Sequence, residues 1–343
     1  MRRRNLIFGL LAVVTMGRAH AQQSGKVFRV TIVHPTFPAA QFSGKQLREL
    51  AKVAEASGDA FPLAFFNELD RLGYVEGQNL LIDGYSGQGR ASHYADLARD
   101  VVSRNPDVII TISTDLTLDF KAATTTIPIV GVFGGPVESG IVPSLARPGG
   151  NITGASVDIG QEQWGKRIQL LQQVVPQATR FGFLESRAVR QQGEAFARDF
   201  ARQTGITRVG PPFDRPIEEA EYRRVFAALA QDGGEGIVVD DEPENLVNHK
   251  LIVELAEKNR LPAIYPFKMF VGAGGLMSYG VDISALGHSV ADIVGQILKG
   301  AKPSEIPILQ PTKFELAINL KAAKALGLSV PPELLTVADD VIE

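Results

Sequence analysis

Few residues in this sequence have the chemistry and spacing of a catalytic or metal site. The histidines beyond the first 21 residues are His34, His93, His249 and His288, and they lack the spacing of metal ligands. The chain contains no cysteine, which excludes a thiolate nucleophile and a cysteine-ligated zinc ion. It also lacks H-E-x-x-H, G-x-S-x-G, a Walker A loop, and G-x-G-x-x-G after a predicted strand. We therefore predict no catalytic residue, no metal, no cofactor and no enzyme.

Three consecutive acids, Asp240, Asp241 and Glu242, follow an apolar run. Such a cluster could bind a metal or supply a general acid and base. Acidic side chains also cap helices and complement the positive end of the helix dipole, and a helix is expected from about residue 244. We favour the capping interpretation, because nothing else in the sequence requires catalysis.

Short β-branched runs alternate with helical patterns along the whole chain. The runs are almost continuously apolar, as in parallel strands covered by helices on both faces. This pattern predicts an α/β fold with doubly wound sheets. Strands are expected at 27–33, 79–83, 107–112, 127–133, 180–184, 206–209, 236–240, 262–265 and 314–320, and helices at about 44–56, 63–72, 92–104, 116–125, 163–175, 190–204, 217–231, 244–259, 284–299 and 321–326.

The chain is long enough for two lobes. Beyond a predicted leader of 21 residues, 322 residues remain, more than one hydrophobic core usually serves. Pro148, Gly149 and Gly150 interrupt the alternation, and the chain is expected to cross back near 276–280. We expect lobe 1 to comprise 22–150 and 281–310, and lobe 2 to comprise 151–280 and 311–343.

The amino terminus has the pattern of a cleaved export signal. Arginines at positions 2–4 precede an apolar run over 6–16, which is too short to span a bilayer, and a small-x-small motif ends at Ala21. We expect removal of residues 1–21 after Sec or twin-arginine export, and a periplasmic mature chain without membrane insertion or a cysteine-linked lipid anchor. The mature net charge would be near −7, which argues against nucleic acid as a partner.

One connection is longer than usual. Residues 35–62 separate the first strand from its helix, where such loops typically have about 2–6 residues. The extra helix expected at 44–56 lies in this insertion. We interpret the insertion either as a lid over a cleft or as a surface addition without a role in binding.

The residues that follow the predicted strands are the ligand candidates, because open α/β sheets bind ligands outside the carboxyl ends of their strands. Ser113 and Thr114 precede a helix, so their hydroxyls and the free N–H groups could hold a carboxylate, although N-capping explains them equally well. The candidates are Pro35, Thr36, Ser113, Thr114, Gly134 and Gly135 in lobe 1, and Ser186, Arg187, Asp240, Glu242, Tyr265 and Phe267 in lobe 2.

Several segments, in this order, resemble one family across nearly the whole mature chain. They are ELDRLGYVEGQN at 68–79, TTIPIV at 125–130, SLARPGGNITG at 144–154, LPAIY at 261–265, AGGLMSYG at 273–280, and GAKP at 300–303 with QPTKFELAINL at 310–320. The chain resembles ABC transporter substrate-binding proteins of the tryptophan or aromatic amino acid type. This resemblance implies the type I periplasmic-binding-protein fold, in which a three-segment hinge joins two Rossmann-like lobes around a solute cleft.

The resemblance also implies a membrane permease and its ATPase as partners, and an amino acid as solute. Ser113 and Thr114 would then meet the carboxylate, and an acid in lobe 2 would meet the ammonium. The chain departs from the family near this pocket. Glu185-Ser186-Arg187 stands where Asn-Pro is common, Glu242-Pro243 replaces Asp-Pro, and Lys268-Met269-Phe270 replaces Arg-Glu-Phe. Arg187 could therefore select an acidic solute.

We expect the solute-binding component of an ABC importer, which captures an amino acid or related carboxylate by hinge closure. Two alternatives stay open on the sequence alone. One is a periplasmic sensor that docks on a membrane receptor, and the other is an exported α/β hydrolase.

Overall fold

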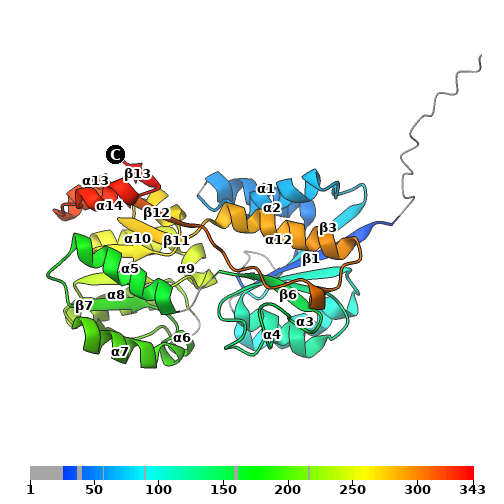
Figure 1. Ribbon diagram of the computed structural model, residues 1–343, viewed down its shortest axis with the longest axis horizontal. Coiled ribbons are helices and arrows are strands. Elements are labelled where there is room, and N and C mark those ends of the chain that lie inside the picture. The colour runs from blue at the N-terminus through cyan, green and yellow to red at the C-terminus, as the bar shows by residue number, and fades with distance from the viewer. Residues whose placement is uncertain (1–25, 37–40, 57, 89, 158–160, 215–216) are drawn as a thin grey trace, which may run out of the picture.

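The computed structural model describes residues 26–36, 41–56, 58–88, 90–157, 161–214 and 217–343, and the predicted signal at 1–21 lies outside them. Two separate sheets, each with its own helices, form two lobes (Figure 1). The first sheet has the order β2-β3-β1-β4-β5-β6. Its strands are β1 (Phe28–His34), β2 (Gln41–Ser43), β3 (Leu80–Ser86), β4 (Val108–Ile112), β5 (Ile129–Phe133) and β6 (Ile152–Ser156).

Helices cover both faces of this first sheet. Buried side chains of β1 alternate between the two cores, with Val30 and Ile32 in one and Val33 in the other. The first core is closed by α1 (Gly44–Ala56), α2 (Phe61–Arg71) and α12 (Ile283–Leu298), and the second by α3 (Tyr94–Ser103) and α4 (Thr114–Ala123). Although α12 comes late in the chain, it packs beside α2 (Figure 1).

The second sheet has the order β13-β12-β11-β10-β9-β7-β8. Only the β11–β12 pairing is antiparallel within it. Its strands are β7 (Arg180–Leu184), β8 (Thr207–Val209), β9 (Gly236–Val239), β10 (Ala263–Tyr265), β11 (Met277–Val281), β12 (Phe314–Asn319) and β13 (Asp340–Ile342).

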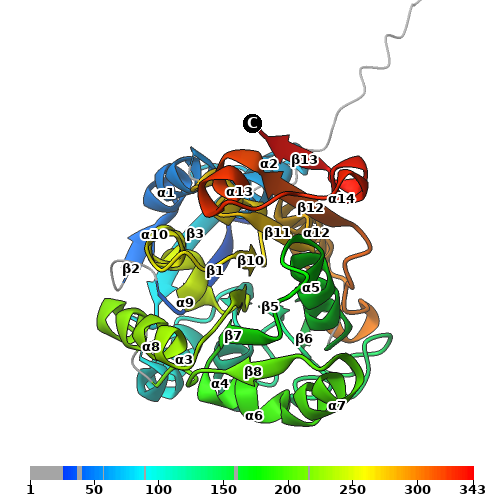
Figure 2. The same ribbon diagram turned by 90° about the vertical axis from the view of Figure 1, so that its left-hand side faces the viewer.

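The second sheet is also covered on both faces. Helices α8 (Glu219–Gln231) and α10 (His249–Lys258) lie on one face and α5 (Gln161–Val174) on the other (Figure 2). Further helices complete the lobe: α6 (Arg187–Gln192), α7 (Glu194–Thr204), α9 (Pro243–Val247), α11 (Lys268–Gly272), α13 (Leu320–Leu326) and α14 (Pro332–Val337). The predicted α/β class with doubly wound sheets is confirmed.

Some elements differ from the sequence prediction. The expected helices at 190–204 and 244–259 are each divided in two, at Gly193 and Asn248. β6 pairs with β5, so the first sheet continues to Ser156, past the residue 150 expected for the lobe boundary. Near the expected crossing at 276–280, residues 277–281 form strand β11 beside β10, and the crossing follows it at Asp282.

The chain passes between the sheets at three places that lie together. β6 ends at Ser156 before α5, β11 ends at Val281 before α12, and residues 310–313 precede β12. The N–H of Ser156 donates to the carbonyl of Leu309 over 2.8 Å, and the Asp282 carboxylate accepts from Lys313 over 2.9 Å. These bonds gather the three crossings into one hinge region.

The insertion at 35–62 belongs structurally to the first lobe. β2 adds an antiparallel edge strand to β3, and the helix predicted at 44–56 is confirmed as α1. Leu47 and Ala51 of this helix are buried in the core, and Arg48 forms two hydrogen bonds with Asp70, of 2.9 and 2.8 Å.

The end of the insertion touches the other lobe. Gly58, with φ of +94°, approaches the second lobe so closely that a Cβ would lie 2.9 Å from the Cα of Met269. Phe61 packs against cores of both lobes. In the described part of the chain, no helix combines the length and apolar character needed to cross a membrane.

We predict that Gly154→Ala strongly destabilises the first lobe. Gly154 has φ of +145°, and a Cβ there would lie 2.0 Å from the carbonyl oxygen of Gly131, its partner in β5. The free energy of unfolding, measured with urea, should fall by roughly 3 kcal/mol or more. In the control Gly272→Ala, nothing lies within 4 Å of the Cβ position, and stability should change by less than about 0.5 kcal/mol. Equal stability of the two variants would contradict the β5–β6 register.

Candidate functional site

The crossings place the carboxyl ends of the two sheets opposite one another. Few residues separate the end of β6 from α5 of the second lobe, and one residue separates β11 from α12 of the first lobe. The carboxyl edges of both sheets must therefore face the same region between the lobes (Figure 1). Because open α/β sheets bind ligands at these edges, this region is the candidate site.

His34 ends β1 at this edge. Its Nδ1 accepts a hydrogen bond from the N–H of Thr36 over 3.1 Å, which requires an unprotonated Nδ1. Burial lowers the pKa of His34 to about 4, so the ring is neutral at physiological pH. Thr36 is half-buried beside it, and Pro35 is buried. This part of the edge offers a neutral, polar surface.

The hydroxyls of Ser113 and Thr114 are engaged within the first lobe. Ser113 Oγ caps α4 by accepting from the N–H of Leu116 over 3.2 Å. Thr114 Oγ1 lies 3.1 Å from the carbonyl of Gly134, to which it donates, and accepts from the N–H of the same residue over 3.2 Å. These bonds join the ends of β4 and β5. The capping interpretation thus accounts for Ser113, while Thr114 and Gly134 form a link between strands.

The acidic cluster lies at the carboxyl end of β9. Asp240 is 7% exposed, and burial raises its pKa, with further increases from the charges of Asp241 and Glu242. Glu242 accepts a hydrogen bond at Oε2 from the N–H of Ser186 over 2.7 Å. The structure therefore brings the predicted residues Ser186, Asp240 and Glu242 together, on the ends of β7 and β9.

A fully buried side-chain pair fixes these two strand ends. Asn245 donates from Nδ2 to the carbonyls of Leu184 and Asp240, each over 3.1 Å, and its Oδ1 accepts from the hydroxyl of Tyr222 over 2.9 Å. Asn245 is 1% exposed and Tyr222 is 0% exposed. We call these two residues the Tyr222–Asn245 clamp. It holds the backbone at Asp240 without using the Asp240 carboxylate.

Two polar residues of α5 reach the same edge and are not predicted from the sequence. Arg167 is 1% exposed, its Nε donates to the carbonyl of Tyr279 over 2.8 Å, and its charge opposes the rise in the pKa of Asp240. Gln163, one turn earlier, is 2% exposed. The sequence does contain one signal that could have identified them. Gln163 and Arg167 are four residues apart, on the helix face that also carries the buried Ile168 and Leu171, so two polar residues interrupt an apolar face.

The other predicted ligand residues have different surroundings. Arg187 is exposed and its Nε donates to Asp214 over 3.2 Å, so its charge is paired at the surface. Tyr265 is 1% exposed and stacks on Phe270, with ring centroids 4.9 Å apart. Phe267 is also buried in the core of the second lobe. Gly135, half-buried with φ of +44°, forms the turn after β5.

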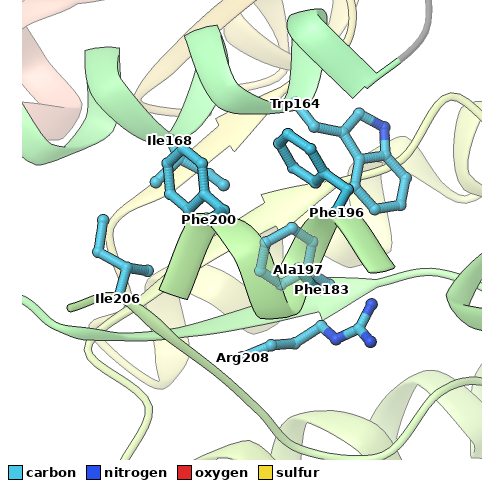
Figure 3. Close-up of a pocket in the computed structure, with 8 residues that line it drawn as sticks. All are labelled: Trp164, Ile168, Phe183, Phe196, Ala197, Phe200, Ile206 and Arg208. Carbon is cyan, nitrogen blue, oxygen red and sulfur yellow. The ribbon is translucent and has the colours of Figure 1, made fainter. Parts of the chain in front are cut away.

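A small pocket of the second lobe lies apart from these strand ends (Figure 3). Aromatic side chains of α5 and α7 face β7 and β8 across it, and Arg208 closes one side. Its volume is about 10 Å³, the space of roughly one water molecule, so it is a packing gap rather than a solute site. Among the described residues, no cluster of His, Asp or Glu could hold a metal ion.

Comparison with known proteins agrees with this geometry. Residues 53–342 match the family described as ABC transporter substrate binding protein. A tyrosine-binding protein of Clostridioides difficile is 27% identical over 281 residues, which cover 80% of this chain and 79% of the relative. The observed sheets and the family match confirm the resemblance and the type I periplasmic-binding-protein fold predicted from the sequence.

Two solved structures share the fold. A conserved domain protein of Vibrio cholerae is 24% identical, with a TM-score of 0.78, and covers 92% of this chain and all of its own. A Streptococcus pneumoniae ABC domain in complex with L-Trp is 23% identical, with a TM-score of 0.75 and the same coverage.

We predict that Tyr222→Phe destabilises the second lobe by about 1–3 kcal/mol. The change leaves the buried Oδ1 of Asn245 without the 2.9 Å hydroxyl bond, and an unsatisfied buried acceptor destabilises the folded state by that amount. Urea unfolding measures the difference. Tyr279→Phe serves as control, because that ring is half-buried and packs through its apolar face. If both variants unfold alike, the clamp does not carry the stability assigned to it.

Proposed function

Because this chain belongs to the family of ABC transporter substrate-binding proteins, we propose that it captures an amino acid or related carboxylate between its lobes for import. The family consists of binding proteins rather than enzymes, so solute should be bound and released unchanged. A membrane permease and its ATPase would receive the solute. The amino-terminal pattern supports a periplasmic location.

The observation that carries the proposal is a buried acid and a buried base that interact at the interlobe edge. Asp240 and Arg167 are 7% and 1% exposed, and the arginine acts electrostatically on the carboxylate. Charges are rarely buried unless they are paired or serve binding. An α-amino acid carries an ammonium and a carboxylate close together, and both charges would find a partner here. Asp240 would meet the ammonium.

Hinge closure would couple binding to transport. Solute can shift the lobes toward a closed state only if it binds that state more tightly than the open one. The three crossings lie together, so few backbone dihedrals would have to change. A permease could then distinguish the loaded protein by the relative position of the lobes.

The proposal is tested by thermal unfolding of the mature protein against amino acids, dicarboxylic acids and small sugars. A ligand at 1,000 times its dissociation constant stabilises by about 4.1 kcal/mol. At roughly 2–4 °C per kcal/mol for domains of this size, the melting temperature should rise by about 8–16 °C. We expect such a shift with one or more amino acids and none with sugars. A shift confined to sugars, or no shift with any carboxylate, would refute the proposed solute class.

The variant Asp240→Asn should bind that amino acid at least about tenfold more weakly, because a charge-assisted bond to the ammonium becomes a neutral one.

The same variant should nevertheless melt at a higher temperature than wild type near pH 7. Burial and neighbouring acids raise the pKa of Asp240, so its ionised form destabilises the folded state as pH rises above about 3.9, the ordinary value. The gain should disappear below about pH 4, where the carboxyl is protonated in both states.

The control Asp232→Asn removes an exposed carboxylate at the end of α8 and should change neither affinity nor the pH dependence of melting. Isothermal titration calorimetry measures the affinity, and differential scanning calorimetry measures the melting temperature. Undiminished affinity of Asp240→Asn would exclude an ammonium at this carboxylate.

A further inference from the structure

The side-chain amide of Gln163 is a buried hydrogen-bond donor. The residue is 2% exposed, and its Nε2 has no hydrogen-bond partner among the residues that the structure describes. Buried amide groups are almost always hydrogen-bonded, since desolvation without a partner destabilises the folded state. A neutral apolar side chain of similar length would fit this position without that loss. The exception leaves a buried donor that a bound group would satisfy.

The position of Gln163 on α5 places the residue beside the interlobe region. It is the third residue of α5, which begins soon after the chain leaves β6 of the first lobe. Four residues later, on the same helix face, Arg167 bonds to the carbonyl of Tyr279 in β11. One Nη atom of Arg167 lies 3.6 Å from the Cβ position of Gly280, near the carboxyl end of that strand. This face of α5 thus covers the strand ends of the candidate site.

Two positive features lie at this place. The amino end of α5 carries the positive end of the helix dipole. The guanidinium of Arg167 adds a full positive charge one turn further along. Carboxylate oxygens are strong acceptors for an amide N–H in such surroundings. By contrast, the Thr114 hydroxyl already donates to the carbonyl of Gly134, and Ser113 Oγ accepts from an N–H of α4.

We propose that Gln163 donates a hydrogen bond from Nε2 to the carboxylate of the solute, which lies at the amino end of α5 in the second lobe. This inference rests on the proposed function and adds the place of the carboxylate. The predicted carboxylate site at Ser113 and Thr114 is replaced by one formed by Gln163, Arg167 and the first turn of α5. Gln163 is then a residue that selects solutes bearing a carboxylate.

The test compares Gln163→Met with wild type by calorimetric titration. The first probe is the amino acid that gives the largest melting shift with wild type, and the second is the corresponding amine without the carboxylate. Gln163→Met should bind the amino acid at least about tenfold more weakly and the amine with unchanged affinity. The ligand-free variant should melt at the wild-type temperature or above it, because an unsatisfied buried amide has been removed.

Two further variants sharpen the result. Gln169→Met changes an exposed glutamine of the same helix and should leave the affinity for both probes unchanged. Gln163→Glu places an acid against the carboxylate and should weaken amino acid binding more than Gln163→Met does. Its weakening should diminish as pH falls and the introduced acid becomes protonated.

The outcomes separate this inference from the proposed function. Wild-type protein that binds no amino acid refutes both. Wild-type protein that binds an amino acid, with Gln163→Met equal to it, refutes the role of Gln163 alone. An equal loss for amino acid and amine, or a lower melting temperature of the ligand-free variant, would assign Gln163 to the structure of the lobe instead.

Discussion

The short crossings between the two sheets are the constraint on which the rest of the structure depends. The N–H of Ser156 donates to Leu309 and the N–H of Asp282 to Lys313, so the three segments run together. Because β6 and β11 both lead into these segments, polar loops at the strand ends gather in one region. The helices bury apolar surface on the outer faces of each sheet and leave that region to polar side chains. The covered faces of the sheets thereby supply stability, and the gathered strand ends form the candidate binding region.

The candidate site can be predicted from the sequence only in part, because its residues come both from strand ends and from a buried helix face. A position after an apolar run identifies Asp240, since strand ends are where open α/β sheets place ligands. Arg167 and Gln163 lie on a helix rather than after a strand. The only sign of them in the sequence is that two polar residues stand on an otherwise apolar helix face. The sequence also leaves open whether Ser113 caps a helix or binds a ligand. That distinction depends on the distance between Ser113 Oγ and the N–H of Leu116, which only the structure gives.

The fold follows more directly from the sequence, because buried parallel strands such as 108–112 and 180–184 are almost continuously apolar. β6 is one of the strands that the sequence pattern does not predict. Its sequence, Ile152–Ser156, contains Gly154 and Ala155 instead of a branched run and follows a proline–glycine break. Gly154 pairs with Gly131 of β5, where only a small residue fits. Tertiary contact rather than local propensity therefore makes this segment a strand.

The single residue that joins β11 to α12 has a mechanical consequence. Each lobe is built on its own sheet, so a change of dihedral angles at Asp282 would turn the lobes as two levers about the crossings. Atoms near that axis travel little, and the displacement grows in proportion to their distance from it. The outer rims of the lobes would therefore report the angle between them most strongly. A membrane partner that spans both rims could measure that angle without ever touching the solute.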